Sequence, residues 1–225
     1  MTEKIIKALD AAYRLTGTSC LVIDFGTNKV VYDNNLFFLK YATKENKRQD
    51  AIDPYWALMA DETLQAVTAM VEDFWEYCKE LPPEELSGVS LIADVPIMLG
   101  KHKVFINQRF TPLLLREDGS VRLGLIVISH SIQKKMLAQI VTSKKKRLMY
   151  DFKRRRFYEE EKPISLSEME RIILLLAKKG LISTIIAELM FKSVNTIKTH
   201  RQRIFQKLGV HSMEEAFTYI ENYML

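Results

Sequence analysis

Residues Ser165 to Val210 read SLSEMERIILLLAKKGLISTIIAELMFKSVNTIKTHRQRIFQKLGV, which is the pattern of three short helices joined by tight turns. The first helix starts at the capping box Ser167-x-x-Glu170, in which each side chain accepts a hydrogen bond from a free backbone amide of the first turn. This helix ends at Gly180, because glycine readily takes the left-handed conformation that closes many helices.

The second helix is expected at about residues 182–190, and Phe191 with Lys192 forms the turn after it. Ser193 is a favourable N-cap for the third helix, which we expect from Val194 to Leu208. The apolar residues of the three helices recur at the spacing of one helical face and predict a shared core. The core residues so predicted are Met169, Ile172, Ile173, Leu176, Ile185, Ile186, Leu189, Ile197, His200, Ile204 and Leu208.

The opposite face of the third helix carries Asn195, Lys198, Thr199 and Gln202. The major groove of DNA accepts one helix, and its base edges bind amide, hydroxyl and cationic side chains. We therefore predict that these four residues read bases. An ordinary solvent-exposed face is the alternative, but such faces commonly carry acidic residues, and residues 191–211 contain none.

Six further side chains near this face suit the phosphate backbone, which binds basic groups, hydroxyls and helix N-termini. They are Lys192, Ser193, Thr196, Arg201, Arg203 and Lys207. Residues 131–225 hold 19 Lys and Arg against 10 Asp and Glu, a net charge of +9, whereas residues 1–130 hold 14 against 18, a net charge of −4. The opposite signs indicate two modules, and the basic one indicates a polyanionic partner.

Several pieces of the segment resemble the LuxR/NarL (GerE-type) transcription regulators over about Ser165 to Leu225: LSEMER, the break at Gly180, IAELM, S-x-N-T-I-K-T-H and KLGV. Two positions depart from the family pattern. Ile185 stands where an acidic residue is usual, and Met169 where arginine is common. The resemblance implies that the third helix recognises duplex DNA and that the histidine of the motif serves structure.

After Gly209 another capping box, Ser212-x-x-Glu215, predicts a short amphipathic fourth helix. In the LuxR/NarL family the fourth helix dimerises the DNA-binding domain, so the resemblance implies a homodimer. Packing of this helix onto the helix-turn-helix core is an equally open alternative.

The first 132 residues predict a different fold class. Consecutive strands joined by tight turns indicate an antiparallel sheet, and helices placed before and between them indicate an α+β domain. The expected strands are Ser19–Phe25, Val30–Asp33, Val89–Met98, His102–Pro112 and Val121–His130, and the expected helices are residues 3–15 and 55–80, the latter started by Asp53-Pro54.

This order resembles a PAS domain over about residues 17–132, and the matching pieces are LVIDFGTNKVVYDN and FINQRFTPLLLREDGSVRLGLIVIS. In PAS domains a five-stranded antiparallel sheet cups a pocket that is closed by helices from the middle of the sequence. The resemblance implies a PAS-like sensor or dimerisation domain at residues 1–132, followed by an all-α four-helix helix-turn-helix domain at residues 163–225. A GAF-type antiparallel sensor fold is the alternative, and the pattern names no cofactor.

Residues 133–162 lie between the two domains and are predicted to form a basic connector that is partly helical. Ile132, Met136 and Ile140 recur every four residues, as on one face of a helix. The clusters Lys144–Arg147 and Lys153–Arg156 either face solvent or contact flanking DNA phosphates.

The sequence contains no glycine-rich phosphate loop, nucleophile elbow or metal-spaced cluster of histidines and carboxylates, so we predict neither an enzyme nor a metal site. Cys20 and Cys78 have no metal or redox spacing. The N-terminus has no signal pattern and no apolar run is long enough to cross a membrane, so we expect a cytoplasmic protein without membrane contact. A phosphoacceptor receiver domain needs alternating strands and helices, which residues 89–130 contradict.

These observations predict a DNA-binding transcription regulator. Its expected partners are double-stranded DNA, a second copy of the chain, a small molecule in the PAS-like domain and RNA polymerase. The alternative is a protein-interaction module that contacts RNA polymerase or another regulator and whose PAS-like domain binds no ligand.

Overall fold

The computed structural model describes residues 2–16, 19–27, 29–34, 56–118, 120–144, 146–159 and 164–223. The chain divides into two compact units, Met1–Glu160 and Glu161–Leu225, and each is described by itself.

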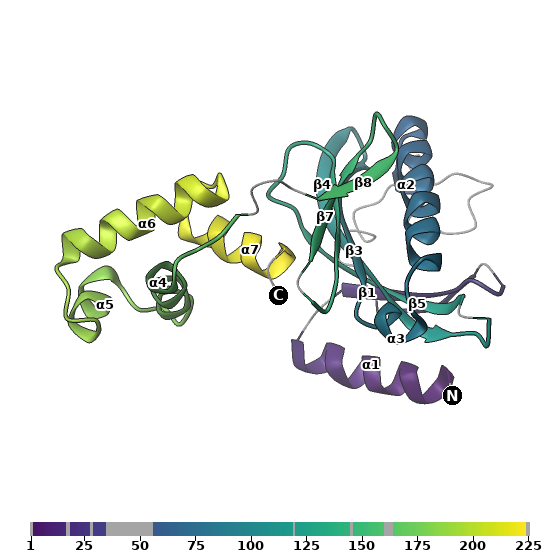
Figure 1. Cartoon of the computed structure of the whole chain (residues 1–225), viewed down its shortest axis with the longest axis horizontal. Coiled ribbons are helices and arrows are strands. Elements are labelled where there is room, and N and C mark those ends of the chain that lie inside the picture. Colours follow the sequence, from purple (N-terminus) through teal and green to yellow (C-terminus); the bar gives the residue numbers. More distant parts are fainter. Residues whose placement is uncertain are drawn as a thin grey trace. The chain divides into compact units, whose positions relative to one another are not determined.

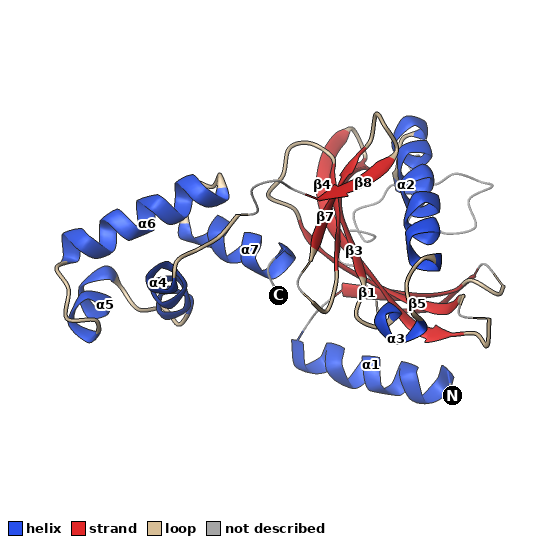
Figure 2. Cartoon of the chain, viewed as in Figure 1, coloured by secondary structure: helices blue, strands red, loops and turns tan. Residues whose placement is uncertain are grey.

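The first unit is built on one antiparallel sheet of eight strands in the order β2-β1-β5-β4-β3-β6-β7-β8. Figure 2 shows the strands as a single curved layer. The strands are β1 (Ser19–Asp24), β2 (Lys29–Asp33), β3 (Ser90–Leu99), β4 (His102–Leu115), β5 (Val121–His130), β6 (Leu137–Val141), β7 (Arg147–Asp151) and β8 (Arg156–Glu159). The first five confirm the five predicted strands and the α+β fold, with small shifts at their ends.

Tight turns set the register of these strands. Gly100, with a φ of 62°, lies between β3 and β4, where Leu99 pairs with His102. Between β4 and β5 the chain is closed by a hydrogen bond of 2.7 Å from the Arg116 amide to the Ser120 carbonyl. Because side chains alternate across a strand, this register places the apolar residues of neighbouring strands on one face.

The described part of the first unit contains four helical segments: α1 (Thr2–Thr16), η3 (Trp56–Leu58), α2 (Asp61–Lys79) and α3 (Pro83–Leu86). Helix α2 runs alongside the sheet (Figure 1) and buries Val67, Met70, Phe74 and Cys78 against its apolar face. The helix expected at residues 55–80 is therefore confirmed in its main part, although it starts at Asp61. The expected start at Asp53-Pro54 lies outside the described residues.

The prediction of a partly helical connector at residues 133–162 is wrong, because this region forms β6, β7 and β8 of the sheet. Strand β6 pairs with β3 and continues its apolar face through the pairs Ala93–Ala138 and Leu91–Ile140. The four-residue spacing behind the prediction does not mark one element, because Ile132 and Met136 come before β6 and only Ile140 lies in it. Antiparallel pairing with the neighbouring strand β3 holds residues 137–141 as a strand.

The hairpin of β7 and β8 is fastened to α2. Arg155, which has a φ of 49°, donates from its guanidinium to Asp73 at 3.1 Å and to Glu72 at 3.2 Å. The Tyr150 hydroxyl also donates to Asp73. The pKa of Tyr150 is raised to about 12, mainly by burial and by this hydrogen bond, so the hydroxyl remains a donor at neutral pH.

The basic clusters of residues 144–147 and 153–156 are largely bound within the first unit. Lys144 lies 2.7 Å from Glu85, and Arg147 donates to Gln139 at 2.7 Å. Together with the ion pair of Arg155, these contacts give part of each cluster a partner within the first unit, and a contact of the clusters with DNA phosphates stays a prediction.

The second unit consists of four helices, α4 (Glu168–Lys178), α5 (Ser183–Leu189), α6 (Val194–Leu208) and α7 (Met213–Tyr223). They confirm the predicted four-helix arrangement. Helix α4 starts at the predicted capping box, in which Ser167 and Glu170 each accept a hydrogen bond from the other's backbone amide. Helix α6 starts at Ser193, whose side chain accepts from the Thr196 amide, and it ends at Gly209 with a φ of 66°.

The core of the second unit differs in part from the predicted one. Ile173, Ile186, Ile197 and Ile204 are fully buried, as expected, and Leu208 is buried as well. Three other members of the predicted core are exposed, namely Ile172, Ile185 and Leu189. The short helix α5 buries the adjacent pair Ile186 and Ala187 instead.

Candidate nucleic-acid interface

Helix α6 has two distinct faces. Ile197, Ile204 and Leu208 are buried in the core, whereas Asn195, Lys198, Thr199 and Gln202 are all exposed on the other side. One helix of fifteen residues thus anchors itself with apolar side chains and presents amide, ammonium and hydroxyl groups outward. We call these four exposed residues the reading face.

The N-terminus of α6 is held by hydroxyl groups. The Ser193 Oγ accepts from the Thr196 amide at 3.1 Å and lies 2.9 Å from the Thr196 Oγ1. Lys192 precedes the cap and is exposed. The first turn of a helix carries free amides and a partial positive charge, so this end of α6 suits an anionic group such as a DNA phosphate.

Three basic side chains of α6 have different surroundings. Arg203 is exposed. Arg201 is half-buried and donates to the Ser183 Oγ at 2.8 Å, which ties α6 to the start of α5. Lys207 donates to the Glu170 carboxylate at 2.7 Å and to the Ser165 carbonyl at 3.1 Å.

The Glu170 carboxylate is the acceptor at the centre of this contact, and its side chain is 4% exposed. It also accepts from the Ser167 amide at 2.7 Å. Burial raises the pKa of Glu170, but the hydrogen bonds from Lys207 and Ser167 outweigh that effect, and the pKa lies below its usual value. From the sequence Glu170 is recognisable only as a capping residue, because its partner Lys207 lies 37 positions away along the chain.

His200 is half-buried on the inner side of α6. Its Nδ1 atom is buried and has no hydrogen-bond partner among the described residues. The ring therefore faces the interior of the unit, as the predicted core position requires, although it is less buried than the isoleucines beside it.

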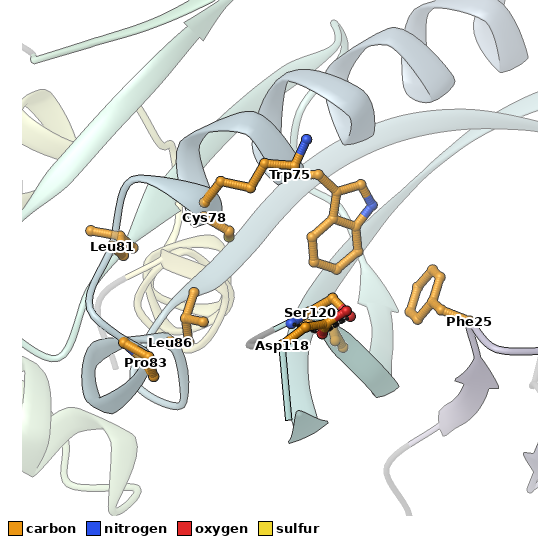
Figure 3. Close-up of a pocket in the computed structure, with 10 residues that line it drawn as sticks. Phe25, Trp75, Cys78, Leu81, Pro83, Leu86, Asp118 and Ser120 are labelled. Atoms are coloured by element: carbon orange, nitrogen blue, oxygen red, sulfur yellow. Dashed lines mark hydrogen bonds between the residues drawn. The ribbon is translucent and has the colours of Figure 1, made fainter. Parts of the chain in front are cut away.

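The first unit contains a separate feature, a pocket of about 680 Å³ between α2, α3 and the start of β5. In Figure 3 the aromatic rings of Phe25 and Trp75 lie toward one end and Leu81, Pro83 and Leu86 toward the other. The Phe25 and Trp75 rings meet edge to face with centroids 5.3 Å apart, and Phe110 packs behind both.

The polar groups of the pocket are few. The Asp118 carboxylate accepts from the Ser120 hydroxyl at 2.6 Å and from the Ser120 amide at 2.9 Å, and these bonds lower the pKa of Asp118. Burial raises the pKa of the Cys78 thiol to about 12, so the thiol is neutral at physiological pH. Among the described residues the lining is mainly apolar, with Asp118 and Lys79 as its charged members, and such a pocket suits a small organic molecule.

Within the described residues, no group of three or more His, Cys, Asp or Glu side chains is placed to hold a metal ion. Among the same residues no helix has the length and apolar character that crossing a membrane requires.

A helix-turn-helix with an acid-free, exposed polar face on its last helix is characteristic of a DNA-binding protein. Residues 164–220 match the family described as "Bacterial regulatory proteins, luxR family". The second unit is therefore a LuxR-family helix-turn-helix domain, the DNA-binding part of a transcription regulator.

Solved structures of similar arrangement include the phage VqmA–DPO complex, with 16% sequence identity over 99% of this chain and 92% of that one and a TM-score of 0.33. The VqmA dimer of Vibrio cholerae is 12% identical over 95% and 86% of the two chains, with a TM-score of 0.35. An RNA-binding light-oxygen-voltage receptor is 11% identical over 91% and 48%, with a TM-score of 0.33. Because these TM-scores are low, the second unit is identified by the family match at residues 164–220 alone. Among curated proteins, none matches the chain.

Proposed function

We propose that α6 lies in the major groove of DNA and that Asn195, Lys198, Thr199 and Gln202 contact base edges. The observation that carries this proposal is their common exposure on the side of α6 opposite to Ile197 and Ile204. Amide side chains bind adenine and ammonium groups bind guanine, so these four residues suit a DNA site that contains both A·T and G·C base pairs.

Contacts to the DNA backbone are proposed for Lys192, Ser193, Thr196 and Arg203, which lie at the N-terminus or on the exposed side of α6. The sequence also suggested Arg201 and Lys207. We give these two a positioning role instead, because Arg201 binds Ser183 and Lys207 binds Glu170 within the domain. These contacts fix the orientation of α6 relative to α4 and α5, and hence the direction in which α6 lies in the groove.

Binding measurements on the full chain test the assignment. We expect Lys198→Ala and Gln202→Ala each to weaken binding to a duplex that the protein selects from a random library, by about 1–3 kcal/mol for each lost base contact. Lys179→Ala removes the same charge from the exposed end of α4, outside the reading face, and is the matched control. Equal affinities for all three variants and the wild type would refute the assignment.

The salt dependence of binding separates DNA recognition from the alternative. Lysine and arginine that neutralise phosphates release counterions, so the affinity falls steeply as salt increases. A protein-interaction module would lack this dependence. The exposed side chains Leu175, Ile182 and Leu189 on α4 and α5 favour an additional protein contact, for example with RNA polymerase, beside the DNA contact.

The pocket of the first unit is proposed as the site of a small-molecule signal, so that this unit is a PAS-like sensor. The support is the combination of about 680 Å³ of space with the aromatic rings of Phe25 and Trp75 and the charged side chains of Asp118 and Lys79. Native mass spectrometry of freshly purified protein, wild type beside Trp75→Ala, tests it. A retained mass that the variant loses supports the proposal, and the absence of any ligand effect on Trp75 fluorescence across a metabolite extract contradicts it.

A homodimer is proposed as the active form, because LuxR/NarL proteins dimerise and helix-turn-helix dimers bind half-sites about one helical turn apart. As a regulator of bacterial DNA it acts in the cytoplasm. Mass photometry of the protein–DNA complex measures the number of chains per duplex, and one chain on a site without repeated halves contradicts the dimer.

A further inference from the structure

The second residue after helix α5, Phe191, has an unusual backbone conformation. Phe191 has a φ of 51°, in the left-handed region. The Phe191 amide donates to the Glu188 carbonyl at 3.1 Å, and the Lys192 amide donates to the Ala187 carbonyl at 2.9 Å. These two bonds form a Schellman motif, in which the left-handed position is normally glycine.

The helix before α5 and the helix after it provide a comparison. Helix α4 ends with the same pair of bonds, from Gly180 to Ala177 and from Leu181 to Leu176, and its left-handed residue is Gly180 with a φ of 85°. Helix α6 ends at Gly209 with a φ of 66°. The domain thus uses glycine at two left-handed helix ends and phenylalanine at the third.

Phe191 contributes little to the packing of the domain, because the residue is 95% exposed. A bulky side chain in the left-handed region is unfavourable, and an exposed aromatic ring adds contact with water. Neither effect stabilises the fold. Residues held in sparsely populated backbone regions cluster at functional sites, including sites that bind ligands.

The place of Phe191 in the fold identifies the partner. It lies in the turn between α5 and α6, next to Lys192 and the cap residue Ser193. In helix-turn-helix complexes the first helix crosses the DNA backbone and the N-terminus of the second enters the major groove. The turn between them therefore lies at the edge of that groove, where the apolar group available to a phenyl ring is the C5-methyl of thymine.

We propose that Phe191 is a specificity-determining residue that packs its ring on a thymine methyl group at the end of each half-site. This proposal rests on the proposed DNA binding by α6 and adds a fifth base-contacting residue to the reading face.

The test uses the full chain and a duplex selected by the wild-type protein from a random library. Each thymine of the duplex is replaced in turn by deoxyuridine, which removes only the methyl group. At one thymine per half-site we expect the wild type to lose affinity about fourfold, the effect of leaving one methyl group unburied. Phe191→Ala should bind the original duplex about as weakly and show no difference between thymine and deoxyuridine.

Phe191→Gly separates recognition from folding. Glycine relieves the left-handed strain, so this variant should melt no lower than the wild type and yet bind DNA as weakly as Phe191→Ala. A marked fall in the melting temperature of Phe191→Gly would show a structural role and overturn the proposal. An equal response of the wild type and Phe191→Ala to deoxyuridine would also overturn it.

The outcome for Gln202→Ala distinguishes this inference from the function on which it rests. If Gln202→Ala loses affinity and the Phe191 variants do not, DNA reading by α6 stands and the role of Phe191 is refuted. If the wild type selects no duplex at all, both are refuted.

Discussion

The ammonium of Lys207 lies 2.7 Å from the buried carboxylate of Glu170, so the last turn of α6 is bound to the first turn of α4. The same carboxylate caps α4 through the Ser167 amide. A single acidic group therefore holds together the start of one helix and the end of the recognition helix. We expect the orientation of α6 to depend on it.

Removal of Lys207 tests this connection. Lys207→Ala leaves a buried carboxylate with one hydrogen bond fewer, and a hydrogen bond to a charged group contributes about 1.5–3 kcal/mol. We expect a loss of stability near the lower end of that range, because the lysine side chain is 40% exposed. Urea unfolding of the full chain, followed by helical circular dichroism, measures it, with Lys179→Ala as the matched control. An equal stability of the two variants would contradict the structural role.

The ionisation of Glu170 should make the stability of the folded chain depend on pH. Its pKa is lower in the folded chain than the 4.5 of a free glutamate, so the folded state binds fewer protons. The stabilisation is thus fully present above pH 4.5 and is lost as the pH falls through the folded pKa. Acid titration of the wild type beside Glu170→Gln measures the effect. The idea fails if both show the same dependence of stability between pH 5 and pH 3.

Gly124 on β5 gives a prediction for the first unit. A Cβ at this position would lie 2.2 Å from Phe110 and 2.9 Å from Phe25, two rings of the cluster around Trp75. Gly124→Ala should destabilise the chain by about 1–3 kcal/mol through overpacking and should change the fluorescence of Trp75. Gly100→Ala is a contrasting variant, because it meets only backbone strain and no neighbouring atom. Unaltered fluorescence in Gly124→Ala would contradict the packing described for the pocket.

The cysteines give a prediction at high pH. Burial raises the pKa of Cys78 to about 12 and, with the charge of Asp10, also raises the pKa of Cys20. The thiolate is the reactive form, so both residues should react slowly with iodoacetamide at pH 8 in the folded chain and rapidly in urea. Because the folded pKa lies above the free value of 9.0, the chain should also lose stability as the pH rises past that value. Rapid labelling of Cys78 in the folded protein would contradict its burial.

The sequence predicted the elements whose ends carry local signals. Helix α6 was predicted from Val194 to Leu208, because Ser193 caps its start and Gly209 closes its end. Strand β5 was predicted from Val121 to His130 with the same bounds, because turns flank it.

Elements that depend on distant partners were not predictable in the same way. The residues of β6 pair with β3, which lies about 45 positions earlier, and of the predicted helical stripe Ile132, Met136 and Ile140 only Ile140 lies in this strand. Likewise, the division of α6 into faces follows from the helical period, but the pairing of Lys207 with Glu170 depends on how α4 crosses α6. The strain at Phe191 cannot be read from its identity alone, since only the backbone angle reveals it.

The binding profile of Gln202→Ala tests the central claim most directly, because Gln202 lies in the middle of the reading face on α6. The wild type and the variant are each measured against duplexes in which every base pair of the selected site is changed in turn. We predict that the variant loses discrimination, by about 1–3 kcal/mol, at one base pair of each half-site and keeps the wild-type profile elsewhere. A variant profile equal to that of the wild type at every position would contradict the reading of DNA by this face of α6.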